Sequence, residues 1–163
     1  MPSRRKPARR LKGGFTLIEV LVVCAIMVLL AGMLMAGYVR FNRKRQVEEA
    51  ALNFATFLQD QQKRANSGDL VECSVGEKLE GYAVSITSAP TSVAATVANC
   101  SGALPSTYEL INDTEFVENM AVKFLPLSRG VDLTKGDTKI TKYGYIYIVN
   151  VDTNGSITVA EGP

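Results

Sequence analysis

The amino-acid sequence predicts an α+β protein in which a long N-terminal helix, transmembrane in its first half, packs on a C-terminal antiparallel β-sheet. Three observations lead to this fold class. No charged residue occurs between positions 20 and 39, and apolar residues at helical spacing follow that run. Beyond Gly68 apolar residues alternate with polar ones, which is typical of strands with one buried face. A helix followed only by strands favours a sheet covered by that helix.

The first fourteen residues form a cationic leader with six basic residues and no acidic one. The chain after Gln46 has 8 basic and 15 acidic residues, so its net charge is −7 although the whole chain of 163 residues carries +2. A cationic leader suits the anionic cytoplasmic face of a membrane. An acidic domain argues against nucleic-acid binding, which needs a basic surface. The leader cations are Arg4, Arg5, Lys6, Arg9, Arg10 and Lys12.

Residues 15–39 form a candidate membrane span. The apolar segment is long enough to cross about 30 Å of hydrocarbon. It is too long for the apolar region of a secretory signal, and no small-residue cleavage site follows it. Four basic residues come directly after it, Arg40, Arg43, Lys44 and Arg45. Because the leader cluster is larger and earlier, we expect a single-pass inner-membrane protein with a cytoplasmic N-terminus and an extracytoplasmic C-terminal domain.

Glu19 is the one charged residue near the start of this span. A carboxylate inside a bilayer costs about 2–3 kcal/mol at the helix centre and less near the interface. Two interpretations follow from the residue alone. Either Glu19 has a specific partner, or it lies high enough in the bilayer to reach the lipid headgroups.

The residues around Glu19 favour the first interpretation. The leader ends Lys12-Gly13-Gly14, and the span begins Phe15-Thr16-Leu17-Ile18-Glu19. This string, with its basic leader and apolar run, resembles the prepilin signal of type IV pilins and type II secretion pseudopilins over residues 9–38. The resemblance implies cleavage between Gly14 and Phe15 by a membrane prepilin peptidase and N-methylation of Phe15. Glycine at both positions before the bond leaves the backbone free to extend in a protease site.

The same resemblance implies the partners of the chain. Glu19 would pair with the Phe15 amine of a neighbouring pilin or pseudopilin subunit during assembly, since a buried charge is tolerable only when it is paired. An inner-membrane assembly platform and membrane lipid would be further partners. A looser likeness over residues 50–87, based on the order and spacing of elements, is to H-type pseudopilins and minor pilins.

The helix continues past the membrane as an amphipathic segment over residues 40–68. Polar residues occupy its other faces, and Gly68 suits a left-handed C-terminal cap. The domain organisation is therefore a leader at 1–14, a span and filament-core helix at 15–39, this continuation, and an extracytoplasmic β-rich domain at 69–163. The apolar stripe of the continuation consists of Val47, Ala50, Ala51, Phe54, Leu58 and Ala65.

Alternation predicts strands at 70–75, 82–87, 108–111, 121–125, 143–151 and 156–160, the last two joined by a turn at 152–155. Residues 88–106 are small and polar and are expected to form a long loop that holds at most a short strand near 93–97. Cys24 lies in the apolar run. Cys73 and Cys100 either form a disulfide in an oxidising compartment or remain thiols, because their spacing alone does not decide between the two.

The sequence predicts no enzyme, no cofactor and no metal site. It contains no histidine, which excludes Ser-His-Asp and Cys-His nucleophiles and histidine-ligated metals. Asp152, Asn154 and Gly155 resemble part of a calcium loop, but the full ligand pattern is missing and a plain turn is favoured. Lys135-Gly136-Asp137 is expected to be a solvated turn.

Two other functions remain open from the sequence. A bitopic membrane protein that keeps its leader and presents a binding domain would share the span but not the prepilin signal. A DNA-uptake pilin would need a basic patch, for which Lys135, Lys139 and Lys142 are the candidates, although the acidic domain makes nucleic acid an unlikely partner. The residues do not distinguish a secretion system from a type IV pilus or a competence filament.

Overall fold

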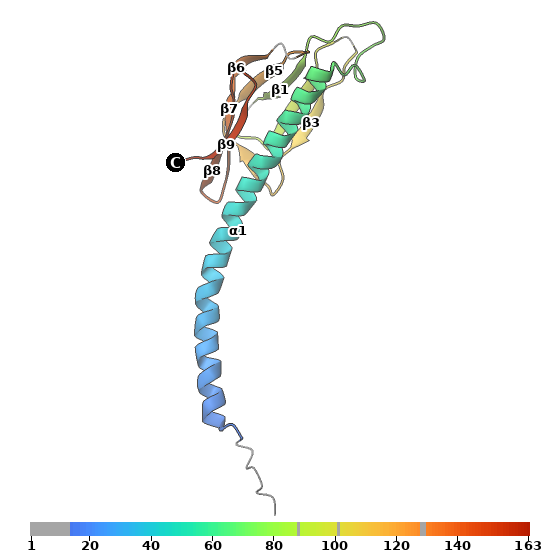
Figure 1. Ribbon diagram of the computed structural model, residues 1–163. Coiled ribbons are helices and arrows are strands. Elements are labelled where there is room, and N and C mark those ends of the chain that lie inside the picture. Colours follow the sequence, from blue (N-terminus) through green and yellow to red (C-terminus); the bar gives the residue numbers. More distant parts are fainter. Residues whose placement is uncertain (1–13, 88, 101, 128–129) are drawn as a thin grey trace, which may run out of the picture. The chain divides into compact units, whose positions relative to one another are not determined.

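The computed structural model describes residues 14–87, 89–100, 102–127 and 130–163 (Figure 1). The chain divides after Arg40 into two compact units, Met1–Arg40 and Phe41–Pro163. One helix, α1 (Leu17–Ser67), contributes residues to both units, and the strands come after it. The sequence predicted a helical span from residue 15 and its continuation to residue 68, so the helix begins two residues later and ends one residue earlier than predicted.

In the first unit, every α1 side chain whose placement the structure describes is exposed, including Leu17 at 83% and Val28 at 72%. No part of the chain that the structure describes covers these apolar side chains. Among the described residues, α1 is the helix long and apolar enough to cross a membrane. The apolar surface of this unit is therefore left for lipid or for other protein chains.

In the second unit, the remainder of α1 presents one buried face. All six residues of the predicted apolar stripe have an exposed fraction of 0%, which confirms the helical spacing predicted from the sequence: Val47, Ala50, Ala51, Phe54, Leu58 and Ala65. The rings of Phe54 and Phe116 pack edge to face with centroids 4.8 Å apart. Tyr108 lies 5.6 Å from Phe54 and stacks on Phe57 at 4.5 Å. This helix face thus forms the core with the strands that follow it.

The strands of the described ranges form two antiparallel sheets (Figure 1). The five-stranded sheet has the order β3-β2-β1-β5-β6, and the four-stranded sheet has the order β4-β7-β8-β9. A long apolar helix packed on antiparallel sheets confirms the predicted α+β fold class. The strands of the first sheet are β1 (Tyr82–Ile86), β2 (Val93–Ala98), β3 (Ser106–Glu109), β5 (Met120–Phe124) and β6 (Val131–Lys135). Those of the second are β4 (Glu115–Phe116), β7 (Asp137–Lys142), β8 (Tyr145–Val151) and β9 (Ile157–Glu161).

Specific hydrogen bonds hold the C-terminal end of α1 and the hairpin next to it. At the C-terminus of α1, Gly68 has φ 66° and donates to the Ala65 carbonyl, while Asp69 N–H donates to the Arg64 carbonyl. This is the Schellman pattern for which Gly68 was expected to serve. Gln62 Nε2 donates to the Gly155 carbonyl at 2.9 Å, so the predicted hairpin between β8 and β9 docks on the helix.

The predicted strand over residues 70–75 is wrong. This segment forms turns, with Cys73 N–H donating to the Leu70 carbonyl and Glu77 N–H donating to the Ser74 carbonyl. Val71 and Val75 are 88% and 106% exposed, so neither supplies the buried face that an alternating pattern implies. The apolar residues of this segment lie on an exposed surface and do not form a strand.

The predicted solvated turn at Lys135-Gly136-Asp137 is also wrong. β6 ends at Lys135 in one sheet and β7 begins at Asp137 in the other, so Gly136 is the point where the chain changes sheets. A Cβ at Gly136 would lie 2.3 Å from the Val151 carbonyl oxygen, which explains the glycine. Both strands are rich in Lys, Thr and Asp, and this is why alternation did not reveal them. The short strand allowed near 93–97 is β2, paired on both sides, and the loop prediction for 88–106 holds only around it.

Candidate functional site

The first candidate site is the junction between the leader and α1. Thr16 precedes the first helical residue, and its carbonyl accepts the first helical hydrogen bonds from the N–H groups of Glu19 and Val20. The Thr16 hydroxyl accepts a further hydrogen bond from Glu19 N–H at 3.3 Å. Thr16 is therefore the N-cap of the helix, and Glu19 occupies the third helical position.

This cap leaves the Gly14–Phe15 peptide bond outside the helix. Gly14, Phe15 and Thr16 have no regular secondary structure, Phe15 is 81% exposed, and a Cβ at Gly14 would meet nothing within 4 Å. A protease needs an extended and accessible backbone, which a helical bond does not offer. The leader cations and Gly13 lie outside the described residues.

Glu19 is the acidic residue of the first turn of α1 and is exposed. An acidic side chain at this end of a helix interacts favourably with the partial positive charge of the free N–H groups. No ion pair joins Glu19 to a basic residue within the described ranges. The carboxylate is thus available to a cation from outside the described chain.

Thr16 was not recognised from the sequence, where Gly14, Phe15 and Glu19 received roles. The signal was present. Thr16-Leu17-Ile18-Glu19 is a threonine, two intervening residues and a glutamate directly before an apolar run, which is the pattern of a helix-capping box.

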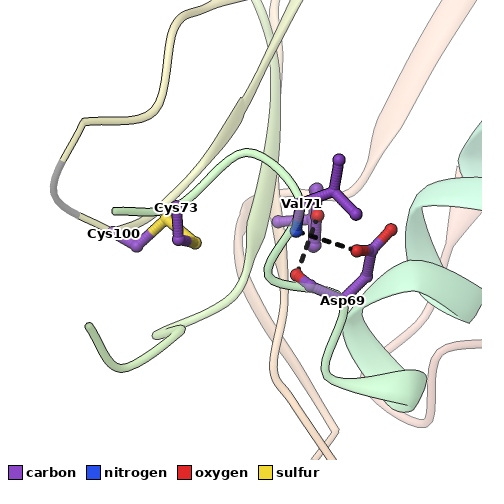
Figure 2. The surroundings of a disulfide bond; sticks show 5 residues. Asp69, Val71, Cys73 and Cys100 are labelled. Carbon is purple, nitrogen blue, oxygen red and sulfur yellow. Dashed lines mark hydrogen bonds between the residues drawn. A yellow bond between two sulfur atoms is a disulfide. The ribbon is translucent and has the colours of Figure 1, made fainter. Parts of the chain in front are cut away.

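Cys73 and Cys100 are joined by a disulfide with their Cα atoms 5.6 Å apart (Figure 2). The bond ties the turn segment after α1 to the end of β2. Asp69 organises the start of that segment, since its carboxylate accepts from Val71 N–H at 3.0 Å and its carbonyl accepts from the Tyr82 hydroxyl. Cys24 is exposed and is the free cysteine of the described chain.

The three lysines of the candidate basic patch all have acidic neighbours. Lys135 and Lys139 each lie 2.7 Å from the Glu118 carboxylate, and Lys142 lies 3.5 Å from that of Asp113. Hydrogen bonds from Lys135 and then Lys139 lower the pKa of Glu118 to about 2. The lysines that looked like a cationic patch in the sequence are therefore partly neutralised, since two carboxylates face three cations.

The candidate calcium turn is held by its own backbone. One Asp152 carboxylate oxygen accepts from the N–H groups of Asn154 and Ser156, and Gly155 has φ 81°. This oxygen is thus already engaged in the turn. No group of three or more potential metal-ligating side chains occurs among the described residues.

A shallow apolar pocket lies near the C-terminal end of α1. Its lining includes Leu70, Leu79, Pro126 and Leu127, together with the charged residues Glu77 and Lys78. The pocket therefore offers apolar surface without the convergent polar groups of a catalytic site.

Comparison with known families identifies the N-terminal segment. Residues 9–35 match the model described as the prokaryotic N-terminal methylation motif, which is the prepilin-type signal of type IV pilins and pseudopilins. No curated protein and no solved structure matches the chain. The matched segment contains Gly14, Phe15, Thr16 and Glu19, the residues around which the helix start is built.

Proposed function

Because residues 9–35 carry the prepilin-type signal, we propose that the chain is a type IV pilin-like filament subunit, a minor pilin or a type II secretion pseudopilin. The observation that carries the proposal is the signal itself, placed at the start of a helix whose apolar surface is uncovered. A structural role of this kind needs no catalytic residues, and we propose none.

The first step is processing by a prepilin peptidase on the cytoplasmic side of the membrane. Water hydrolyses the Gly14–Phe15 bond, which leaves a carboxylate on the leader and an amine on Phe15. A sulfonium methyl donor then methylates that amine. The exposed, non-helical backbone on the Phe15 side of the bond supports this step. Cleavage also removes six positive charges that would oppose close packing of helices in a filament.

The second step is assembly through α1. The new Phe15 amine of one subunit pairs with Glu19 of its neighbour, which compensates a carboxylate that is costly in an apolar environment. The exposed helix surface from Leu17 onward then packs against other subunits instead of lipid. The assembly platform of the inner membrane and the other pilin-like subunits are the partners of this step.

The test is the N-terminus and intact mass of the protein after co-expression with a prepilin peptidase. We expect a chain that begins at methylated Phe15. A chain that keeps its leader in the presence of active peptidase would contradict the proposal and favour a bitopic membrane protein with a presented binding domain.

Glu19→Ala tests the assembly step separately. We expect normal cleavage and no filament, because the buried amine of the neighbour loses its partner. Glu19→Asp is the matched control, since it keeps the charge and should retain partial assembly. Normal filaments from Glu19→Ala would contradict the role of Glu19 but leave processing intact.

A DNA-uptake role has weaker support. Of the lysines on which it would rest, Lys135 and Lys139 share Glu118 and Lys142 faces Asp113. A partly neutralised cluster contributes less to phosphate binding than three free lysines, because fewer counterions are released. The absence of salt-dependent DNA binding by the purified protein would exclude this role.

A further inference from the structure

The tip of the β7–β8 hairpin lies next to the first α1 residues of the second unit, where cationic and aromatic side chains meet. Arg43 Cζ lies 5.2 Å from the centroid of the Tyr143 ring, and Lys142 Nζ lies 4.9 Å from it. Next to them in the chain, Arg45 Cζ lies 5.4 Å from the centroid of the Phe41 ring. These are two separate groups, because residues two apart on a helix do not face each other. We use the name tip cluster for both groups together: Phe41, Arg43, Arg45, Lys142 and Tyr143.

The tip cluster presents both rings and charges to the outside. Phe41 is 59% exposed and Tyr143 is 51% exposed. No ion pair links Arg43 or Arg45 to an acidic residue in the described part of the chain, whereas Lys142 is offset by Asp113. The cluster therefore keeps a net positive charge beside two partly exposed aromatic rings.

The backbone conformation at the hairpin tip indicates that turn propensity does not explain a tyrosine at position 143. Tyr143 and Gly144 have φ 56° and φ 81° between the paired residues Lys142 and Tyr145, which is a two-residue turn of the type I′ class. Asn, Asp or Gly adopts the first of these positions easily, while a bulky ring is an outlier there. A residue held in such a conformation points to a function for its side chain.

Arg43 of the tip cluster is also close to the end of the candidate span along the chain. Arg43 is four residues beyond Val39, the last residue of the apolar run, and four residues reach at most about 14 Å by any path. Aromatic residues just beyond a span are typical of both interfacial regions, where their rings lie among the headgroups, and a cation at that depth can pair with a headgroup phosphate.

We propose that the tip cluster binds the anionic phospholipid headgroups of the membrane that anchors the chain, and so holds one end of the second unit against the bilayer before assembly. This inference rests on the proposed function, because it requires the span to lie in a membrane. The chain after Gln46 carries a net charge of −7, so an anionic membrane surface repels most of the domain. This repulsion favours the orientation in which the cationic tip cluster faces the membrane.

The chain contains no tryptophan, so Tyr143→Trp introduces a single tryptophan at the tip, which can be excited selectively over the remaining tyrosines. The full-length variant is reconstituted in phosphatidylcholine vesicles with or without phosphatidylglycerol, and with brominated phosphatidylcholine as a quencher. We expect a blue-shifted emission that is quenched by the brominated lipid only when phosphatidylglycerol is present. High salt should abolish the quenching, because the attraction is electrostatic.

Two further variants make the test specific. Arg43→Gln with Lys142→Gln in the Tyr143→Trp background should lose the quenching, with an unchanged circular-dichroism spectrum showing that the domain is folded. Val75→Trp is the matched control, since Val75 is fully exposed beyond the opposite end of the helix and should show no quenching.

Other outcomes overturn the inference in distinguishable ways. An unquenched Tyr143→Trp variant that is inserted and cleaved refutes headgroup binding and leaves the proposed function intact. A blue shift without quenching by brominated lipid indicates contact with another subunit instead. Quenching in both the Tyr143→Trp and the Val75→Trp variants refutes a contact specific to the tip. A chain that neither inserts nor is cleaved refutes the proposed function and the inference with it.

Discussion

At the scale of single residues, Glu118 forms ion pairs with a lysine of each sheet in the second unit. Lys135 belongs to β6 of the five-stranded sheet and Lys139 to β7 of the four-stranded sheet, and both lie 2.7 Å from the Glu118 carboxylate. The Glu118 carbonyl also accepts from the Thr138 hydroxyl at 2.8 Å. One residue thus links the two sheets next to the point where the chain crosses between them.

Glu118 should make the stability of the domain depend on pH in the acidic range. Its pKa is lowered to about 2 in the fold, so the ionised form stabilises the folded state. That contribution is complete above the unfolded pKa of about 4.5 and is lost as the pH falls towards 2. We expect Glu118→Gln to lower the free energy of unfolding at neutral pH, and the difference from the unmodified protein to shrink in acid.

Urea unfolding of both proteins at several pH values measures this difference. Glu77→Gln is the matched control, because Glu77 forms no ion pair within the described residues. A constant difference between Glu118→Gln and the unmodified protein from neutral to acidic pH would contradict the role given to the two lysines.

Single residues also show which features the spacing of residues in the sequence can and cannot predict. Lys135, Lys139 and Lys142 look like a cationic patch because they lie close together along the chain. Their neutralisation depends on Glu118, which is 17 residues before Lys135, and on a sheet crossing at Gly136. Neither is readable from spacing. Thr16, in contrast, lies within a local capping pattern and could have been predicted.

At the scale of elements, the second half of α1 derives its stability from its buried face. Phe54 has an exposed fraction of 0% and packs against the rings of Phe57, Tyr108 and Phe116. We expect Phe54→Ala to cost about 3–5 kcal/mol of unfolding free energy, since it leaves a cavity among these rings. Leu52 on the same helix is 51% exposed, and Leu52→Ala should cost far less. Chemical unfolding of both variants compares the two faces, and equal losses would contradict the packing.

The disulfide is the second stabilising feature at this scale. It closes a sequence separation of 27 residues around β1 and β2, and the loss of a bridge of this size costs about 2–4 kcal/mol. We expect Cys73→Ala with Cys100→Ala to lower the Tm of the domain, and reductant to lower that of the unmodified protein similarly. Cys24→Ala should leave the Tm unchanged, because Cys24 belongs to the first unit. Insensitivity to reductant would show that the thiols are not bonded in solution.

Elements with strong periodicity were predictable and those with polar surfaces were not. The helix stripe, β1, β5, β8 and β9 follow their patterns closely because one face of each contributes to the core. β6 and β7 carry Thr, Lys and Asp on half-buried positions, and β4 has only two residues, so neither pattern nor length marks them. At residues 70–75 the sequence predicted a strand that the structure does not contain, because the apolar residues of this segment are exposed.

At the scale of the whole molecule, charge is separated along the chain and should set orientation. Six basic residues precede the apolar run and four follow it, so the larger cluster is expected to remain in the cytoplasm. We expect protease added outside spheroplasts to digest residues 41–163 while a cytoplasmic marker survives. Replacement of the six leader cations by glutamine should reduce this digestion, because the four later cations then dominate. Replacement of uncharged leader residues should have no effect, and an unchanged digestion pattern after loss of the cations would contradict the orientation argument.

The order of elements along the chain has a consequence for biosynthesis. The stripe ending at Ala65 is made before any strand, and it is covered only when strands up to β9 are present. At about 5–20 residues per second, the roughly 100 residues that separate the stripe from the last strand take about 5–20 s to synthesise. During this interval the nascent chain has an apolar face and no core. The candidate span is synthesised earlier still, so the C-terminal unit folds while it is tethered to that span.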